Sequence, residues 1–242
     1  MLRVISIIVA TLLSCYIVFV AFFFHQRKDE AACTGLQVEV VDSLDKHFVS
    51  KSDIVNILKK AELYPVHKPI GVVNTERIEK ELLKNEMIAR VEAYKTPSHQ
   101  IKLEVEQKIP IIRIISNSGN YYIDNEGTVM PMSPHYVADV PIASGNVEKT
   151  LAKTDLYKFA LFLQKDKFWN DQIEQIYIYP DKEVDLIPRV GDHRIILGDF
   201  TDFEEKLNNL QLFYEEAIPK VGWGKYSIIN LKYKDQIVCT KK

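Results

Sequence analysis

The feature that most constrains this chain is an apolar run near its N-terminus. Residues 4–24 contain no charged side chain, and as an α-helix they would be roughly 31 Å long, about the thickness of a bilayer's hydrocarbon core. A cleavable signal peptide usually has an apolar stretch of only about 7–15 residues followed by a small-x-small site. Here the run ends in Ala21-Phe22-Phe23-Phe24. The sequence therefore predicts an uncleaved transmembrane helix over residues 4–24.

Charge does not decide the orientation of this helix. Arg3 and the α-amino group precede it, and Arg27 and Lys28 follow it, so the positive-inside rule gives close to a tie. The prediction is a tail over residues 1–3, the span, and a polar linker over residues 25–35.

The rest of the chain has the composition of a globular protein. Hydrophobic residues make up 47% of the sequence and charged residues 26%, with a net charge of −2, which is far from the signature of disorder. The near-neutral charge also lacks the basic field of a nucleic-acid-binding protein. We therefore expect no nucleic-acid partner.

The three cysteines carry no framework signal. Cys15 lies within the predicted span, whereas Cys33 and Cys239 lie outside it and far apart in the sequence. A disulfide between Cys33 and Cys239 in an oxidising compartment and two unpaired thiols both remain open.

A first folded domain is predicted over residues 36–109, in the order strand, helix, helix, strand, strand. Residues 36–41 alternate and are rich in β-branched side chains, which is typical of a short strand. The final two strands form a hairpin that turns at residues 96–99. Apolar residues alternate along its arms with polar or aromatic residues, which predicts one buried face: Ala89, Val91, Ala93, Ile101, Leu103 and Val105.

Two capping signals mark the helices of this domain. Ser50-Lys51-Ser52-Asp53 has the form of a capping box and opens a run with apolar residues at helical spacing. Tyr64-Pro65 is expected to end that helix, because the residue before a proline is pushed out of the α region. Asn74 is expected to cap the second helix, over residues 75–85.

A second, β-rich domain with flanking helices is predicted over residues 110–242. Its longest helix is expected to start at a capping box, Thr201-Asp202-Phe203-Glu204, and another helix covers residues 155–165. The predicted strands are short: residues 111–115, 121–123, 128–130, 173–179, 184–187, 194–197, 226–233 and 236–240.

No catalytic motif stands out. The six histidines are scattered, and no Gly-x-Ser-x-Gly or P-loop pattern occurs. Ser43-Leu44-Asp45-Lys46 matches Ser-x-x-Lys, a pattern with only two fixed positions, and Gly222-Trp223-Gly224-Lys225 precedes a predicted strand instead of a helix that could bind an anion. The sequence predicts a non-enzymatic protein with no cofactor, no metal site and no small-molecule substrate.

Several local patterns resemble the motifs of one known family. Residues 105–111, with Glu106, Lys108 and Pro110, are similar to a Val-x-Glu-Lys-x-Pro junction between two domains. Further segments resemble the other motifs of that family in the same order: Tyr121–Val129, Val140–Gly145, Ile196–Gly198 with the helix after it, and Ile229–Tyr233. By these motifs the chain resembles the bacterial cell-division proteins FtsQ/DivIB.

The resemblance implies an α+β fold with a single transmembrane helix, a POTRA domain (βααββ) and a β-rich FtsQ-type domain. It also implies a cytoplasmic N-terminus, an extracytoplasmic body, and a place in the inner membrane at the division septum. The function implied is a divisome scaffold that links early and late division proteins and binds FtsB/DivIC, with FtsL, through its terminal strand edge. Septal cell-wall synthesis proteins are a further class of partner that the resemblance suggests. The partner-binding residues would be Leu231, Lys232, Tyr233, Gln236, Ile237, Val238 and Cys239.

Two departures from the family pattern limit what can be carried over. Only about three residues precede the span, so family contacts made by a cytoplasmic segment do not transfer. Lys232 stands where arginine is common, which keeps the charge but loses bidentate hydrogen bonding. Tyr233 has two readings, an aromatic anchor for a partner or a core residue.

Three rival functions fit the sequence less well. A POTRA-containing factor in membrane-protein assembly or secretion would need several such domains and a C-terminal barrel. A membrane-tethered enzyme is disfavoured by the lack of catalytic motifs. An extracytoplasmic sensor would need a cytoplasmic output domain, which three residues cannot form.

Overall fold

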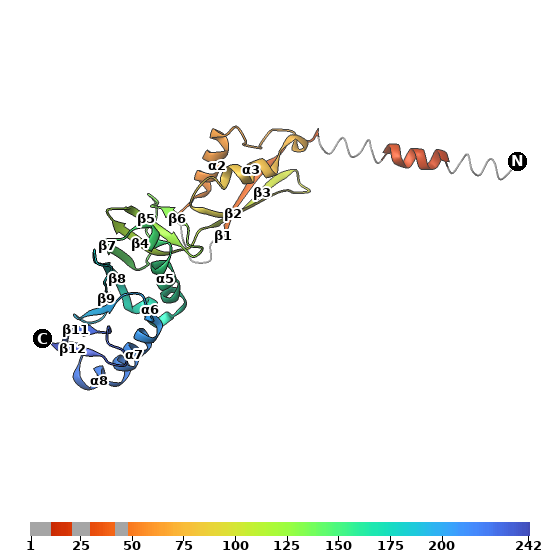
Figure 1. Ribbon diagram of the computed structural model, residues 1–242. Coiled ribbons are helices and arrows are strands. Elements are labelled where there is room, and N and C mark those ends of the chain that lie inside the picture. The colour runs from red at the N-terminus through yellow and green to blue at the C-terminus, as the bar shows by residue number, and fades with distance from the viewer. Residues whose placement is uncertain (1–10, 21–29, 42–47) are drawn as a thin grey trace. The chain divides into compact units, whose positions relative to one another are not determined.

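The structure is a computed structural model that describes residues 11–20, 30–41 and 48–242. The chain divides into two compact units, Met1–Gln107 (unit 1) and Lys108–Lys242 (unit 2). Figure 1 shows the elements of both units, and each unit is described by itself below.

Unit 1 contains one three-stranded sheet in the order β1-β3-β2. The strand β1 is parallel to β3, and β2 forms an antiparallel hairpin with β3. The chain order is strand, helix, helix, strand, strand, with a short 3-10 helix between the two α-helices. The elements are β1 (Gly35–Val41), α2 (Lys51–Lys60), η1 (Ile70–Val72), α3 (Thr75–Leu82), β2 (Ile88–Lys95) and β3 (Gln100–Gln107).

Both helices of unit 1 pack on the same face of this sheet. Along β3, alternate residues are fully buried and the residues between them are not. The helices contribute buried residues at i and i+4, so the core lies between them and the sheet. The side chains of this core are Ile54, Leu58, Ile78, Leu82, Ile101, Leu103 and Val105.

The helix caps follow the sequence signals at their starts but not at their ends. Ser50 and Asp53 form the predicted capping box, and Asn74 accepts a hydrogen bond from the Arg77 N–H. The first helix ends at Lys60, before Tyr64-Pro65, because Glu62 takes a positive φ of 59° and closes a C-terminal motif. In it, Leu63 N–H donates to Leu58 O at 2.8 Å and Glu62 N–H to Lys59 O at 3.1 Å.

The hairpin of unit 1 differs from the predicted alternation in one place. The β2–β3 register shifts between Ile88 and Arg90, which is a β-bulge with Ala89 as the extra residue. Ala89 is exposed and Ile88 is buried. The prediction of an inward-facing Ala89 was therefore wrong, because period-two patterning assumes an unbroken ladder.

Unit 2 contains one nine-stranded mixed sheet in the order β12-β11-β10-β9-β8-β7-β4-β5-β6. Parallel pairs join β4 to β7, β7 to β8 and β10 to β11, and the other neighbours are antiparallel. The strands are β4 (Pro110–Ser116), β5 (Gly119–Asp124), β6 (Val129–Pro131), β7 (Ile142–Gly145), β8 (Ile173–Ile178), β9 (Val184–Pro188), β10 (Arg194–Gly198), β11 (Tyr226–Asn230) and β12 (Val238–Lys241).

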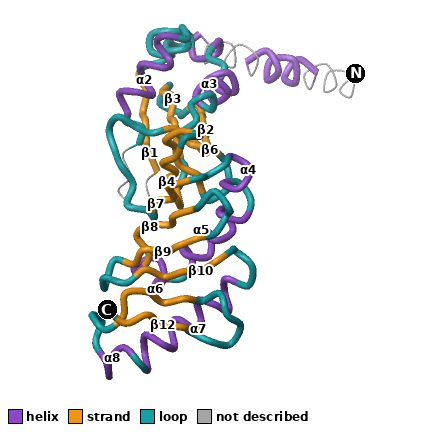
Figure 2. The backbone as a smooth tube through the Cα atoms, turned by 60° about the vertical axis from the view of Figure 1, so that its left-hand side comes forward, coloured by secondary structure: helices purple, strands orange, loops and turns teal. Residues whose placement is uncertain are grey.

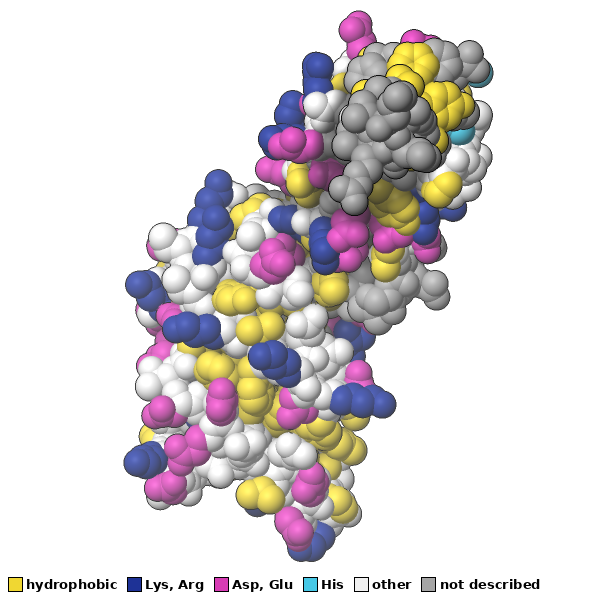
Figure 3. Space-filling model, turned by 90° about the vertical axis from the view of Figure 1, so that its right-hand side faces the viewer, with side chains coloured by type: hydrophobic (Ala, Val, Ile, Leu, Met, Phe, Trp, Pro, Cys, Tyr) yellow, Lys and Arg dark blue, Asp and Glu magenta, His cyan; other side chains and the backbone are white. Residues whose placement is uncertain are grey.

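Helices cover one face of this sheet (Figures 1 and 2). The core lies between them and the sheet, where Trp169, Phe159 and Leu207 are fully buried. On the side of unit 2 shown in Figure 3, hydrophobic side chains lie in a broken band between charged ones. The helices are α4 (Lys149–Ala152), α5 (Asp155–Lys165), α6 (Lys167–Gln172), α7 (Phe203–Glu216) and α8 (Ile218–Val221).

Two predictions for unit 2 need correction. The longest helix, α7, begins at Phe203 without a capping box: its N-cap, Asp202, is left-handed (φ 50°) and makes no side-chain cap hydrogen bond. The final two strands are shorter than predicted, because β11 ends at Asn230 and β12 starts at Val238.

The predicted membrane helix can be compared with the structure only in part. Residues 11–20 are helical, and the rest of the predicted span over residues 4–24 lies outside the described residues. Within the described ranges, no helix combines the length and apolar character needed to cross a bilayer.

Candidate partner-binding edge

Strand β12 lies at one end of the nine-stranded sheet of unit 2. Among the described strands it pairs only with β11, antiparallel, with Asn230 opposite Val238 and Ile228 opposite Thr240. Three of its four residues are exposed and Cys239 is half-buried. One edge of β12 is therefore open to solvent.

The backbone direction along β11 fixes which groups occupy this open edge. Leu231 N–H donates to Ile196 O at 2.9 Å, so Leu231 faces β10, and by alternation Ile228 and Asn230 face β12. At the other end of the pair, Lys242 N–H donates to Lys225 O at 3.3 Å. Lys242 therefore faces β11, and by alternation Thr240 and Val238 face β11 as well.

The N–H groups of Cys239 and Lys241 consequently point out of the sheet. Val238 and Thr240 lie opposite Asn230 and Ile228, so their backbone groups are the ones that bond to β11. Because successive residues of a strand alternate in direction, the N–H groups of Cys239 and Lys241 face away from β11. The Lys241 C=O, in contrast, accepts a hydrogen bond from the Ser227 hydroxyl on β11 at 3.5 Å. The outward N–H groups are the unpaired groups that an added strand requires.

The opposite edge of the sheet is blunted. Strand β6 has only three residues and ends in Pro131, and proline offers no N–H to a neighbouring strand. Its middle residue, Met130, is fully buried. Of the two edges of this sheet, β12 is the one suited to pairing.

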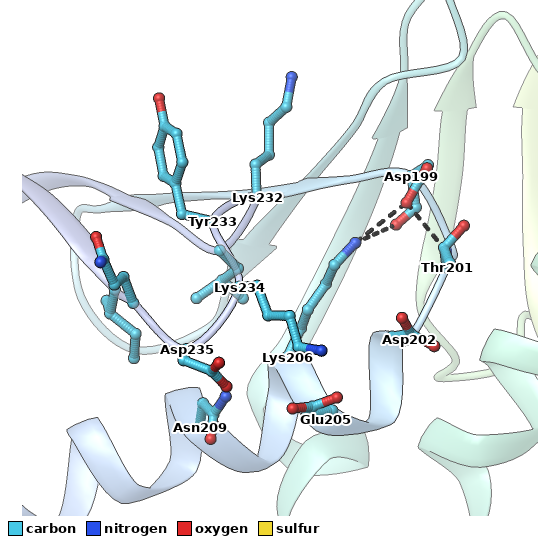
Figure 4. A pocket seen from close by; sticks show the side chains of 13 residues that line it. Asp199, Thr201, Asp202, Glu205, Lys206, Asn209, Lys232, Tyr233, Lys234 and Asp235 are labelled. Carbon is cyan, nitrogen blue, oxygen red and sulfur yellow. Dashed lines mark hydrogen bonds and ion pairs between the residues drawn. The ribbon is translucent and has the colours of Figure 1, made fainter.

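The structure distributes the predicted site residues over the open edge, the loop before it and the core. Leu231 is only 3% exposed and belongs to the hydrophobic core, so it supports the loop and presents no surface to a partner. Tyr233 is 55% exposed, which contradicts its reading as a core residue. Figure 4 shows Tyr233 and Lys232 pointing away from α7.

Lys232 holds the loop against the β8–β9 turn. Its Nζ lies 2.8 Å from a carboxylate oxygen of Glu183, and this hydrogen bond raises the pKa of Lys232. Gly198 leaves room for the side chain, since a Cβ there would lie 2.8 Å from Lys232 Cγ. The aliphatic part of Lys232 is therefore packed, although its ammonium group is accessible.

The other four predicted residues lead into the strand. Gln236 is exposed, and its N–H closes a turn onto Tyr233 O at 3.2 Å. Ile237 and Cys239 are half-buried and pack against the core. Burial raises the pKa of the Cys239 thiol, and Cys33 and Cys239 are both free thiols.

Sequence reasoning did not find the cavity beside this loop, which Figure 4 shows. It has a volume of about 250 Å³ and lies between the loop over residues 231–237 and the start of α7. Lys206 bridges its rim by donating to the Asp199 carboxylate at 3.1 Å, and this hydrogen bond lowers the pKa of Asp199. The polar residues of α7 recur as they do on any solvent-exposed helix face. The sequence therefore contained no signal for a cavity.

A buried aromatic cluster lies at the far end of β12. His193 is 3% exposed, its Nε2 lies 2.6 Å from Tyr214 Oη, and its ring stacks on Trp223 with centroids 6.0 Å apart. Burial lowers the pKa of His193, and the nearby Lys242 lowers it further. Lys242 is held by Asp192 at 3.0 Å, which fixes the residue after β12.

The described residues contain no group of three or more His, Cys, Asp or Glu side chains that could hold a metal ion. The surface at β12 and the loop before it offers backbone groups, the ring of Tyr233, several lysines and the exposed side chains of Val238 and Thr240. Such an arrangement can bind another chain.

Comparison with known proteins agrees with this architecture. A family model described as "FtsQ/DivIB, C-terminal related" matches residues 109–240, more than half of the chain. The chain belongs to the FtsQ/DivIB family. A second model, for a POTRA-like domain, matches residues 31–106 of this FtsQ/DivIB protein, so its fold is α+β, with a POTRA-like domain before a β-rich FtsQ/DivIB-type domain.

One curated relative is the cell division protein FtsQ of Rhodothermus marinus. It is 26% identical to this FtsQ/DivIB protein over 156 residues, which are 59% of this chain and 56% of the relative. The match thus spans about half the length of the relative. Among solved structures, the major extracytoplasmic domain of the trans isomer of the cell division protein DivIB from Geobacillus stearothermophilus covers 48% of this chain and 98% of its own, at 12% identity and a TM-score of 0.35.

Proposed function

We propose that this FtsQ/DivIB protein is a membrane-anchored, non-enzymatic scaffold of the bacterial cell-division machinery. Membership of the family supports the cell-division role, and a relative carries the name cell division protein FtsQ. The protein links early and late divisome proteins by binding FtsB/DivIC and FtsL, and septal cell-wall synthesis proteins are a further class of partner. It works at the division septum in the inner membrane, with residues 1–3 cytoplasmic and the body outside.

The observation that carries this proposal is the open edge of β12. Its outward N–H groups, at Cys239 and Lys241, lie on an exposed strand without proline, whereas the opposite edge ends in Pro131. A partner segment adds here as a further strand, so that backbone hydrogen bonds supply affinity and alternate side chains supply specificity.

The predicted site residues divide this work between them. Tyr233 is the exposed aromatic anchor, and Lys232 supplies a fixed positive charge beside it. Gln236 and Ile237 set the turn into β12, and Val238 and Cys239 present its two faces. Leu231 contributes indirectly, because its burial positions the loop.

The proposed domain layout places the span at residues 4–24, a linker at 25–35, the POTRA domain at 36–109 and the partner-binding domain at 110–242. The uncharged run over residues 4–24 supports the anchor. A reporter fused after Lys242 should be active only in a form that works outside the cytoplasm. A reporter active in the cytoplasm would contradict this topology.

Affinity purification of the detergent-solubilised full chain tests the proposed function. We expect FtsB/DivIC- and FtsL-type proteins to co-purify with it. Tyr233→Ala removes a largely exposed ring, so thermal stability should stay unchanged while partner affinity falls roughly 5- to 150-fold, the equivalent of about 1–3 kcal/mol for a hot spot. Unchanged partner recovery and affinity with this variant would contradict Tyr233 as an anchor.

A further inference from the structure

The three-stranded sheet of unit 1 has two edges, and one of them is blocked. On β2, the N–H of Ala93 donates to the side chain of Glu79, on α3, at 2.8 Å. The bulge at Ala89 breaks the regular spacing of the same edge. A bulge and a covering side chain are devices that protect natural edge strands from pairing.

The backbone of β3 shows which groups face the other edge strand, β1. The C=O of Gln100 accepts a hydrogen bond from the Thr96 N–H at 2.8 Å, so Gln100 faces β2. Directions alternate along a strand. Leu103 and Val105, three and five residues further along, therefore face β1.

The backbone groups of Val38 and Val40 consequently point away from β3 and have no partner among the described residues. Val38 lies opposite Leu103 in the parallel pair, and Val40 lies opposite Val105. In a parallel pair, a residue whose backbone groups point toward the neighbouring strand does not bond to the residue directly opposite. It bonds to the two residues on either side of that opposite residue. Leu103 thus bonds to the residues on either side of Val38, and the N–H and C=O of Val38 point outward.

The side chains of the same residues leave apolar surface at this edge. Leu36, Val38 and Val40 lie on the helix-covered face of the sheet but are only half-buried, whereas the equivalent residues of β3 are fully buried. An added strand with apolar side chains at alternate positions would complete their burial.

The opposite face of the sheet is acidic at this edge. Glu39 lies opposite Glu104, which lies opposite Glu92, so three glutamates form one row across the sheet. Lys102 bridges Glu39 and Glu104 at 3.0 and 2.8 Å, and Arg90 pairs with Glu92. Two cations against three carboxylates leave the row with an excess negative charge.

We propose that β1 is a second strand-addition site, which takes an extended segment of another protein. The segment carries apolar side chains at alternate positions and a lysine or arginine next to Glu39, because cross-strand neighbours of opposite charge stabilise a sheet. A second copy of this chain is a poorer occupant, since two β1 strands side by side would bring two acidic rows together. This proposal concerns unit 1 and is independent of the function proposed for β12.

The test uses the full chain in detergent and a synthetic probe, the blocked peptide Thr-Val-Thr-Val-Lys-Val-Thr-Val-Thr, which reads the same in both directions. Addition of the peptide should slow hydrogen exchange at the amides of Val38 and Val40. Replacing the lysine of the peptide with glutamate should weaken binding roughly 2- to 30-fold. In the protein variant Glu39→Gln, the affinities of the lysine and glutamate peptides should differ less.

Two N-methylated peptides separate strand addition from other modes of binding. One carries N-methyl groups on its valines and the other on its threonines and lysine, so each blocks the pairing edge of one strand orientation. One peptide should bind like the parent and the other should not bind. The proposal would be overturned if both N-methylated peptides bound equally, or if the parent peptide did not bind at about 1 mM. It would also be overturned if hydrogen exchange slowed only at β12, or if the protein self-associated instead of binding the peptide.

Discussion

At the residue scale, Gly145 is a position where the fold leaves no room for a side chain. It has a φ of +88°, and an added Cβ would lie 2.3 Å from Ile178 O on the neighbouring strand β8. Gly145→Ala therefore combines backbone strain with a clash against main chain that cannot move aside. We expect a loss of about 2 kcal/mol or more in the free energy of unfolding, measured by denaturant titration.

Gly224→Ala is the control for that experiment, because Gly224 has neither a positive φ nor a crowded Cβ position. No atom lies within 4 Å of the Cβ position at Gly224, so its substitution should change stability by less than about 0.5 kcal/mol. Similar losses for the two variants would show that the close approach of β7 and β8 does not constrain Gly145.

His193 makes unit 2 sensitive to acid. Burial lowers the pKa of His193 from its usual value near 6.5, so the unfolded chain takes up a proton at a higher pH than the folded chain does. The stability linked to His193 is therefore present above about pH 6.5 and is lost as the pH falls toward the lowered pKa of the folded state. Asp192, Lys242 and Tyr214 surround the ring.

Urea unfolding at pH 7.5 and pH 5.5 checks this prediction. The wild-type protein should lose more stability on acidification than His193→Gln does, because glutamine has no proton to gain in this range. An equal acid response of the two proteins would assign the pH dependence to other groups.

At the scale of elements, two capping signals in the sequence look alike, but only one acts as a cap. Ser50 accepts from the Asp53 N–H at 3.1 Å, and the Asp53 carboxylate accepts from the Ser50 N–H at 2.9 Å. Thr201 precedes a left-handed Asp202 and makes no such contact with α7. Ser50→Ala should cost about 1 kcal/mol and Thr201→Ala close to nothing, as measured by thermal unfolding of the two variants.

If Thr201→Ala proved as costly as Ser50→Ala, the start of α7 described here would be wrong. The pattern Thr-x-x-Glu cannot distinguish the two cases, because a capping box needs extended backbone at the N-cap. At α7 the N-cap is Asp202, one position after Thr201, and its backbone is left-handed. The residue types at these positions do not predict that conformation.

Periodicity predicted the elements that have one buried and one exposed face. The bounds of α5, Asp155–Lys165, agree with those predicted, because its apolar residues recur at helical spacing. Strand β7, Ile142–Gly145, was not predicted as a strand. It is short and contains Ala143, Ser144 and Gly145, and the pairing with β4 and β8 that makes it a strand is invisible to a local pattern.

At the scale of the whole molecule, the sequence indicated the family, the βααββ order of unit 1 and a terminal strand. It did not reveal which backbone groups of that strand are free. The N–H of Val238, for example, faces β11, so a proline at this position would disturb the fold before it disturbed partner binding. The direction in which each N–H of β12 points follows from the register of β10, β11 and β12. The sequence of β12 alone does not specify that register.

Side-chain environments were the other part that the sequence left open. Leu231 and Tyr233 lie two residues apart, and alternation would place both on one face of a strand. The strand ends at Asn230, so Leu231 turns into the core while Tyr233 reaches solvent. The position at which β11 ends therefore determines that Leu231 is buried and Tyr233 is exposed. Tertiary packing sets that position.

The most direct test of the proposed function compares two neighbouring prolines on β12. Lys241 and Thr240 are both exposed, but the Lys241 N–H faces the open edge and the Thr240 N–H faces β11. Affinity for the FtsB/DivIC-type partner is measured for the two full-length variants together with their thermal stability. Lys241→Pro should weaken binding at least tenfold while the protein stays folded, and Thr240→Pro should lower stability. Wild-type affinity in a folded Lys241→Pro variant would contradict strand addition at β12.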